Sequence, residues 1–120
     1  MKRSVELRLQ DIIEYGEKAQ RFLASRTALE FAADEVSFLA AVYALQCVSE
    51  SARALPNEIK EGAQNLPWRA IEDSGNVFRH GYHAIDPERV RWTISNGLPE
   101  LLAFARAELA RIGSDPDSHR

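Results

Sequence analysis

The chain has little cysteine and no long apolar run. Cys47 is the single cysteine among 120 residues, so an intramolecular disulfide and a zinc site built from several cysteines are both excluded. No stretch approaches the roughly 18 consecutive apolar residues that cross a bilayer. The start of the chain, Met1–Glu6, leads into charged residues instead of the apolar core of a signal peptide. These features predict a cytoplasmic protein with no membrane association.

An excess of basic residues is also missing. The chain has 15 Lys and Arg against 18 Asp and Glu, which gives a net charge of -3. No global positive field therefore exists to hold a nucleic acid, and any RNA binding must be local. A chain of 120 residues fits one domain. At this size folding removes roughly two thirds of the unfolded surface from water, which allows a core without disulfides or a structural metal.

The first half of the chain has apolar residues at steps of three and four, which predicts amphipathic helices. One helix spans residues 4–23 with Ser4 as its N-cap. Thr27-Ala28-Leu29-Glu30 forms a capping box that opens a short turn. A longer helix then runs from about Asp34 to Leu55, where Pro56 stops it.

The second half continues the helical pattern. Residues 56–60 predict a short helix that ends at Gly62, and a further helix begins at Trp68 and reaches about Tyr82. Asp86-Pro87-Glu88 predicts the start of a last helix that extends to residue 112, with a kink at Asn96–Pro99. We expect an all-α, antiparallel bundle of four or five helices over residues 1–112, followed by a disordered tail at 113–120.

The segment from Gly75 to Asp86, which follows Leu66-Pro67-Trp68, combines polar and small residues at one helix end. Asn76 and His80 are four residues apart, so they share a helix face. Gly75 and Gly81 each cost a helix about 1 kcal/mol relative to alanine. Glycines kept at this cost predict the close approach of another backbone or of a ligand.

Taken together, these segments resemble the HepT-like branch of the HEPN superfamily, which are small all-α proteins. The resemblance covers nearly the whole chain. Its marks are the stretch 7–15, Phe31-x-x-Asp34, Ala41-Val42, Ser49-Glu50-Ser51-Ala52, Leu66-Pro67-Trp68, the block from Asn76 to Tyr82, Ile85-Asp86, and Leu98-Pro99-Glu100-Leu101-Leu102.

The resemblance implies the toxin of a type II toxin–antitoxin pair, a homodimer with a two-fold composite cleft, and a minimal nucleotidyltransferase as antitoxin. It also implies metal-independent RNA cleavage, in which the ribose 2′-OH attacks the adjacent phosphate. His80 would exchange protons, Asn76 would orient the phosphate, and Arg79 would stabilise the developing charge. Arg69, Arg79 and His83 would bind RNA, and Tyr82 would accept AMP from the antitoxin.

The chain departs from the family's motif at its arginine. The motif is an arginine, four to six residues, a histidine, one residue and a tyrosine, and His80 and Tyr82 match its end. The three positions allowed for the arginine hold Asp73, Ser74 and Gly75. Arg79 is the nearest replacement, but it directly precedes His80, about 100° round the helix, so within one protomer it cannot simply substitute for an arginine one turn back. In the two-fold composite cleft that the resemblance implies, an arginine of the second protomer could approach His80.

Two other readings follow from the missing arginine. The chain could be a catalytically impaired HEPN module that binds a partner in its dimer cleft, or a regulatory subunit and AMPylation substrate of the nucleotidyltransferase.

Three ligands with the spacing of His80, His83 and Asp86 do not converge on one metal ion, so we predict neither a metal nor a cofactor. Trp68 and Trp92 are expected to be core or interface anchors, and Cys47 a packing residue.

Overall fold

The computed structural model describes residues 4–80 and 85–113, without the side chains of residues 76–80. Every regular element in these two ranges is helical, and no strand occurs in them. The elements are α1 (Val5–Leu23), α2 (Ala28–Ala33), α3 (Glu35–Ala54), α4 (Asn57–Glu61), α5 (Trp68–His80), α6 (Pro87–Trp92), a π-helical turn η2 (Thr93–Gly97) and α7 (Leu98–Gly113).

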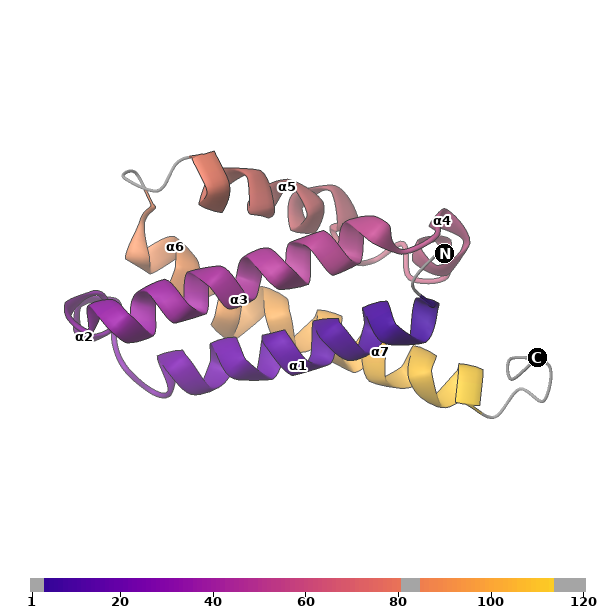
Figure 1. Ribbon diagram of the computed structural model, residues 1–120, viewed down its shortest axis with the longest axis horizontal. Coiled ribbons are helices and arrows are strands. Elements are labelled where there is room, and N and C mark those ends of the chain that lie inside the picture. Colours follow the sequence, from indigo (N-terminus) through magenta and orange to yellow (C-terminus); the bar gives the residue numbers. More distant parts are fainter. Residues whose placement is uncertain (1–3, 81–84, 114–120) are drawn as a thin grey trace.

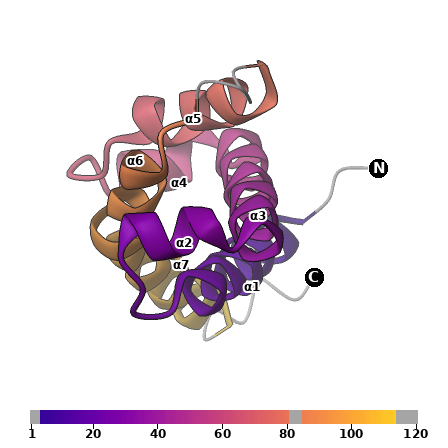
Figure 2. The same cartoon turned by 90° about the vertical axis from the view of Figure 1, so that its left-hand side faces the viewer.

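The long helices run antiparallel, as Figure 1 shows. α1 and α3 lie side by side, α5 returns along α3, and α6, η2 and α7 run back beneath α5 to reach α1. Seen end-on, these four passes of the chain surround one core, and α2 crosses the end of the bundle (Figure 2). The predicted all-α antiparallel bundle is confirmed.

Local capping explains where the helices begin. Ser4 Oγ accepts the backbone N–H of Leu7 at 3.1 Å, and Thr27 and Glu30 form the predicted reciprocal capping box. Asp86 Oδ1 accepts the N–H of Glu88 at 3.0 Å at the start of α6. The predicted starts of α1, α2 and α6 are therefore confirmed.

Asp34 fixes the corner between α2 and α3. Its carboxylate accepts hydrogen bonds from Arg26 Nη1 at 2.8 Å and from the backbone N–H of Ser37 at 3.2 Å. The Arg26 guanidinium, together with Ser37, lowers the pKa of Asp34 from 3.8 to about 2, so this carboxylate stays ionised at neutral pH. Arg91 Nε of α6 donates to the carbonyl of Arg26 at 3.0 Å, which ties the corner to α6.

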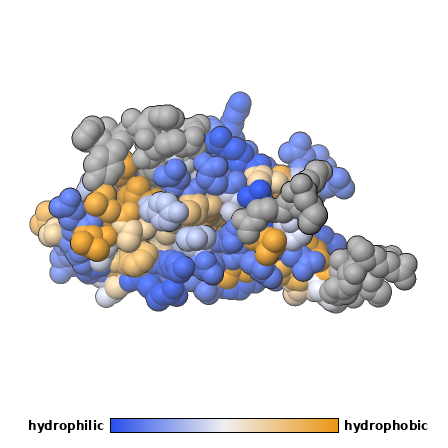
Figure 3. Space-filling model, viewed as in Figure 1, coloured by the Kyte–Doolittle hydropathy of each residue, from blue (hydrophilic) through white to orange (hydrophobic). Residues whose placement is uncertain are grey.

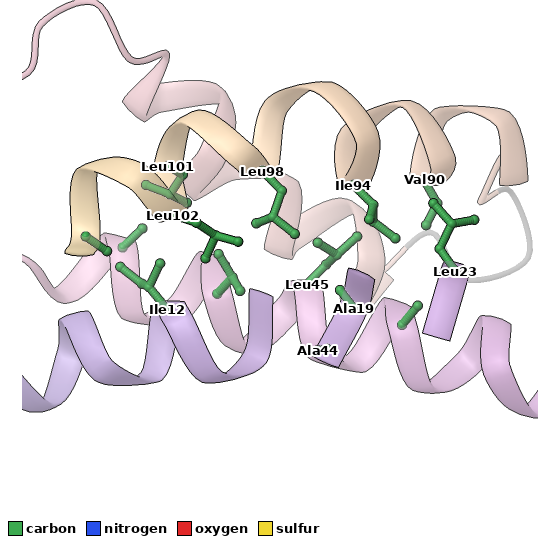
Figure 4. Packing of buried hydrophobic residues seen from close by; sticks show 14 of the residues in the cluster. Ile12, Ala19, Leu23, Ala44, Leu45, Val90, Ile94, Leu98, Leu101 and Leu102 are labelled. Atoms are coloured by element: carbon green, nitrogen blue, oxygen red, sulfur yellow. The ribbon is translucent and has the colours of Figure 1, made fainter. Parts of the chain in front are cut away.

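The core lies between α1, α3 and the passage from α6 to α7 (Figure 4). Leu9 and Ile12 of α1 are fully buried, and Leu102 of α7 is 1% exposed. Gly16 lets α1 and α7 approach closely, because an added Cβ would lie 2.6 Å from Leu102 Cδ2. Burying each such leucine or isoleucine contributes about 1.5–3 kcal/mol.

The interruption predicted at Asn96–Pro99 takes the form of the π turn η2. Pro99 has no N–H to continue the α-helical hydrogen bonds, and the N–H of Leu98 bonds to the carbonyl of Thr93, five residues earlier.

Within the described ranges, no helix is long and apolar enough to cross a membrane.

Candidate functional site

The first half of α5 is anchored to its neighbours by Trp68. The indole Nε1 donates to the carbonyl of Ala63 at 3.0 Å. The indole ring packs edge-on against Phe104 of α7, with 5.2 Å between ring centroids. Trp68 is therefore a core anchor, as predicted, whereas the Trp92 side chain is 60% exposed on α6.

Glu72, one turn further along α5, joins α3 and α4. Its backbone carbonyl accepts hydrogen bonds from Ser49 Oγ at 2.9 Å and from Arg53 Nη2 at 2.7 Å, both on α3. Its carboxylate pairs with Lys60 of α4 at 2.8 Å, and the Lys60 side chain is only 11% exposed. This polar network holds α5 in place along its length and about its axis.

Gly75 is a further anchored position of α5, three residues after Glu72. It is buried, and its N–H donates to Ser49 Oγ at 3.0 Å. An added Cβ would lie 2.6 Å from Ser49 Oγ and 3.0 Å from Ser49 Cβ. The close approach that a glycine in a helix predicts is confirmed here, and it is made by α3 of the same chain. Gly81 lies outside the described residues.

The predicted catalytic positions directly follow this contact. The backbone of Asn76, Arg79 and His80 forms the end of α5, so the structure places these positions on one helix segment next to the anchored half. Their side chains lie outside the described part of the chain, as do Tyr82 and His83 altogether. The catalytic, RNA-binding and modification roles of these five residues remain predictions.

Arg69 lies at the other end of the same helix. It is exposed and borders a shallow depression shared with Lys60, Glu61, Glu72 and Asp73. Because α5 is continuous from Trp68 to His80, eleven residues separate positions 69 and 80 by about 16 Å along the axis. Arg69 thus lies about three turns from position 80, and its RNA-binding role remains a prediction.

A cavity of about 560 Å³ opens beside α5, between α3 and the passage from α6 to α7. Apolar side chains such as Val48, Ile71 and Leu98 line it. Its charged lining residues in the described part of the chain are Asp73, Asp86 and Arg89. Two carboxylates against one guanidinium do not favour phosphate binding, so this cavity is not where we expect the RNA backbone to lie.

The described residues hold no cluster of three or more His, Cys, Asp or Glu side chains able to bind a metal ion. Cys47 is half-buried on α3, and burial raises the pKa of its thiol. A thiol with a raised pKa stays protonated at neutral pH and is a weak nucleophile. The predicted packing role of Cys47 agrees with this environment.

Sequence reasoning missed Ser49, Arg53 and Glu72 as residues that support the site. Ser49 belongs to one of the marks of the family resemblance, but no chemical role was attached to it, and Arg53 and Glu72 belong to no motif. Ser49 gives a weak signal, because it stands between Val48 and Ala52 on the apolar face of α3. A polar residue on such a face is expected to have a hydrogen-bonding partner.

Comparison with known proteins identifies the family. The family model described as "Ribonuclease HepT-like" matches residues 12–108, a span that contains α5 and most of the bundle. The chain belongs to the HepT-like ribonuclease family. It is 30% identical to "Probable ribonuclease HepT" of Thermococcus cleftensis over 102 residues, which are 84% of this chain and 92% of that protein.

Other HepT-like relatives carry similar names. "Putative RNase MJ1380" of Methanocaldococcus jannaschii is 29% identical over 85 residues, which cover 71% of this chain and 78% of that protein. A second protein of that organism, "Putative RNase MJ1216", is 25% identical over 100 residues, 83% of each chain. No solved structure matches the chain.

Proposed function

We propose that this HepT-like protein is a metal-independent endoribonuclease and the toxin of a type II toxin–antitoxin pair. One observation carries the proposal: the family match spans residues 12–108 and so includes the whole helix that bears Asn76, Arg79 and His80. The relatives named as ribonucleases support the same activity.

The proposed reaction needs few groups. The ribose 2′-oxygen attacks the adjacent phosphorus, the bond from phosphorus to the 5′-oxygen breaks, and a cyclic phosphate remains on the first product. His80 is suited to proton exchange with the 2′-OH or the leaving 5′-oxygen, because an ordinary histidine titrates near neutral pH. The Asn76 amide orients the phosphate, and the Arg79 guanidinium stabilises the charge on its oxygens.

We propose in addition that the active form is a homodimer whose interface includes α5, so that the partner subunit supplies the arginine that is missing from positions 73–75. Gly75 does not support this interface, because α3 of the same chain occupies its surroundings. Exposed apolar side chains on α2, α3 and α6 support the association of two copies, among them Leu29 at 82%, Val36 at 79% and Trp92 at 60%. The place of α5 in the interface is part of the proposal. Figure 3 shows apolar residues gathered over the start of α3.

Sedimentation at micromolar concentration is expected to show twice the mass of one chain. Association would take the exposed leucine, valine and tryptophan side chains out of water. Trp92→Glu, which places a charge on this exposed apolar surface, is expected to weaken the dimer. A wild-type monomer at all concentrations would remove the dimer together with the shared arginine.

Cleavage of an end-labelled single-stranded RNA tests the activity itself. The purified protein is expected to cut at equal rates in EDTA and in Mg²⁺, because the RNA supplies the nucleophile and the protein's His80 exchanges the protons. The upstream product is expected to end in a 2′,3′-cyclic phosphate and the downstream product to begin with a 5′-hydroxyl. Cleavage that requires Mg²⁺, or an upstream product that ends in a 3′-hydroxyl, would show a different mechanism.

A second candidate function is a catalytically impaired HEPN module that serves as a regulatory subunit and AMPylation substrate of a nucleotidyltransferase. The observation in its favour is Gly75, which stands at a position allowed for the motif arginine and is packed against Ser49. Absence of RNA cleavage by a folded, dimeric protein would favour this candidate.

A further inference from the structure

We infer that Ser49 and Gly75 form a paired contact that keeps position 75 free of any side chain and fixes the segment of α5 that carries Asn76 and His80. Ser49 is thus a positioning residue of the proposed ribonuclease site. The expected effect of Ser49 on cleavage rests on the proposed function. The contact itself does not, because it follows from the packing between α3 and α5.

One hydroxyl group bridges one turn of α5. Ser49 Oγ donates to the carbonyl of Glu72 at 2.9 Å and accepts the N–H of Gly75 at 3.0 Å. Ser49 is only 1% exposed, so water does not compete for these bonds. A hydroxyl that loses its partners in such surroundings destabilises the fold. The bridge therefore resists both rotation and sliding of α5 against α3.

The fit leaves no room for a side chain at position 75. An added Cβ would meet Ser49 Oγ at 2.6 Å, and Oγ could move away only by rotating and giving up both hydrogen bonds. Ser49 Cβ would still lie 3.0 Å away. An arginine at position 75 would meet the same obstacle at its first carbon, so this one of the three positions allowed for the motif arginine is closed to it.

The bridge acts on the catalytic positions through the helix backbone. On an α-helix, positions 76 and 80 lie about 100° and 140° round the axis from position 75. Positions 76 and 80 therefore lie on nearly the same side of α5, next to the side that contacts Ser49. Both are within about 8 Å of position 75 along the helix axis. Any rotation of α5 about its axis changes the direction of both positions together.

A double-mutant cycle tests the contact without reference to activity. Gly75→Ala in the wild-type background is expected to raise the unfolding equilibrium constant, although alanine is the better helix former, because Ser49 loses its hydrogen bonds. In a Ser49→Gly background, the same substitution is expected to lower that constant by about fivefold, the ordinary preference of a helix for alanine. An equal effect of Gly75→Ala on the unfolding equilibrium constant in both backgrounds would show that Ser49 and Gly75 do not interact, and would overturn the inference.

Ser49→Ala tests the positioning role, with Ser51→Ala as the matched control. Ser51 is also buried, at 4% exposure, and lies about 200° round α3 from Ser49. Under conditions where all proteins are folded, Ser49→Ala is expected to lower kcat for RNA cleavage by about tenfold with little change in KM, and Ser51→Ala to leave both unchanged. Equal kcat values for Ser49→Ala and wild type would overturn the positioning role.

The amide spectrum of the ¹⁵N-labelled protein gives a readout that does not need cleavage. Ser49→Ala is expected to shift the backbone amide signals of residues 75–80, and Ser51→Ala is expected to leave them in place. If wild type fails to cut RNA while these shifts appear, the contact stands and the proposed ribonuclease activity fails. If residues 75–80 keep their signals in Ser49→Ala, the positioning role is wrong whatever the activity.

Gly75→Arg adds a test of the family pattern. Restoring the arginine in the wild-type background is expected to lower the melting temperature and to give no gain in cleavage. The combination with Ser49→Gly is expected to recover part of the lost stability. A stable Gly75→Arg single variant with faster cleavage would overturn the inference.

Discussion

Replacing His80 with alanine is expected to reduce RNA cleavage by at least about tenfold. Loss of an acid–base group that is fully used typically costs about 10²–10⁴-fold. An alanine cannot take the proton of the 2′-OH or give one to the leaving oxygen. The loss is expected in kcat, because the proton moves in the transition state. Single-turnover cleavage of a labelled RNA in EDTA measures it.

His119→Ala is the matched control, since it removes an imidazole from the far end of the chain and is expected to leave cleavage unchanged. Arg79→Ala is expected to weaken cleavage as well, through lost stabilisation of the phosphate oxygens. Sedimentation and helical content of each variant must match wild type. Equal RNA degradation by wild type and His80→Ala would show that the activity comes from a contaminant and would favour the non-catalytic candidate.

Transfer of AMP to Tyr82 by the nucleotidyltransferase is expected to abolish cleavage. The phenolic oxygen attacks the α-phosphorus of ATP, pyrophosphate leaves, and the chain gains a phosphodiester with one negative charge. This tyrosine stands two residues after His80, so the new phosphate would compete with RNA and repel it. Intact mass after incubation of both proteins with ATP is expected to show one added AMP per chain.

Tyr82→Phe is expected to remove the modification and to leave the variant resistant to neutralisation by AMP transfer. The chain offers Tyr15→Phe and Tyr43→Phe as controls. Tyr43 is the stricter one, because its side chain is 63% exposed and open to a modifying enzyme. AMP mapped to Tyr15 or Tyr43 in the wild-type protein would contradict the assignment.

Much of the fold could be predicted because its signals are local. The N-cap at Ser4, the capping box at Thr27 and the proline after Asp86 each act within a few residues of the helix start that they determine. Pro99 likewise interrupts the helix through its own missing N–H. The form of that interruption, a π turn at 93–97, depends on how η2 packs against α1 and could not be predicted.

The candidate site could be predicted only in part. The spacing of Asn76, His80 and Tyr82 identified the segment and its family, and the same spacing showed that the motif arginine is missing. Gly75 was recognised as a point of close approach, although nothing in its neighbourhood indicated what approaches it. The distinction between a contact with α3 and a contact with a second protomer required the structure.

The sequence by itself determined the helices, their order, the family and the residues proposed to carry the chemistry, because these follow from periodicity, caps and short motifs. Only the tertiary structure decided that Ser49 bonds to Gly75 and Glu72 across 26 and 23 residues of chain. It also decided that this contact leaves no space for an arginine at position 75. Such contacts join residues that are far apart in the chain, so their geometry depends on how whole helices pack and leaves no local pattern to read.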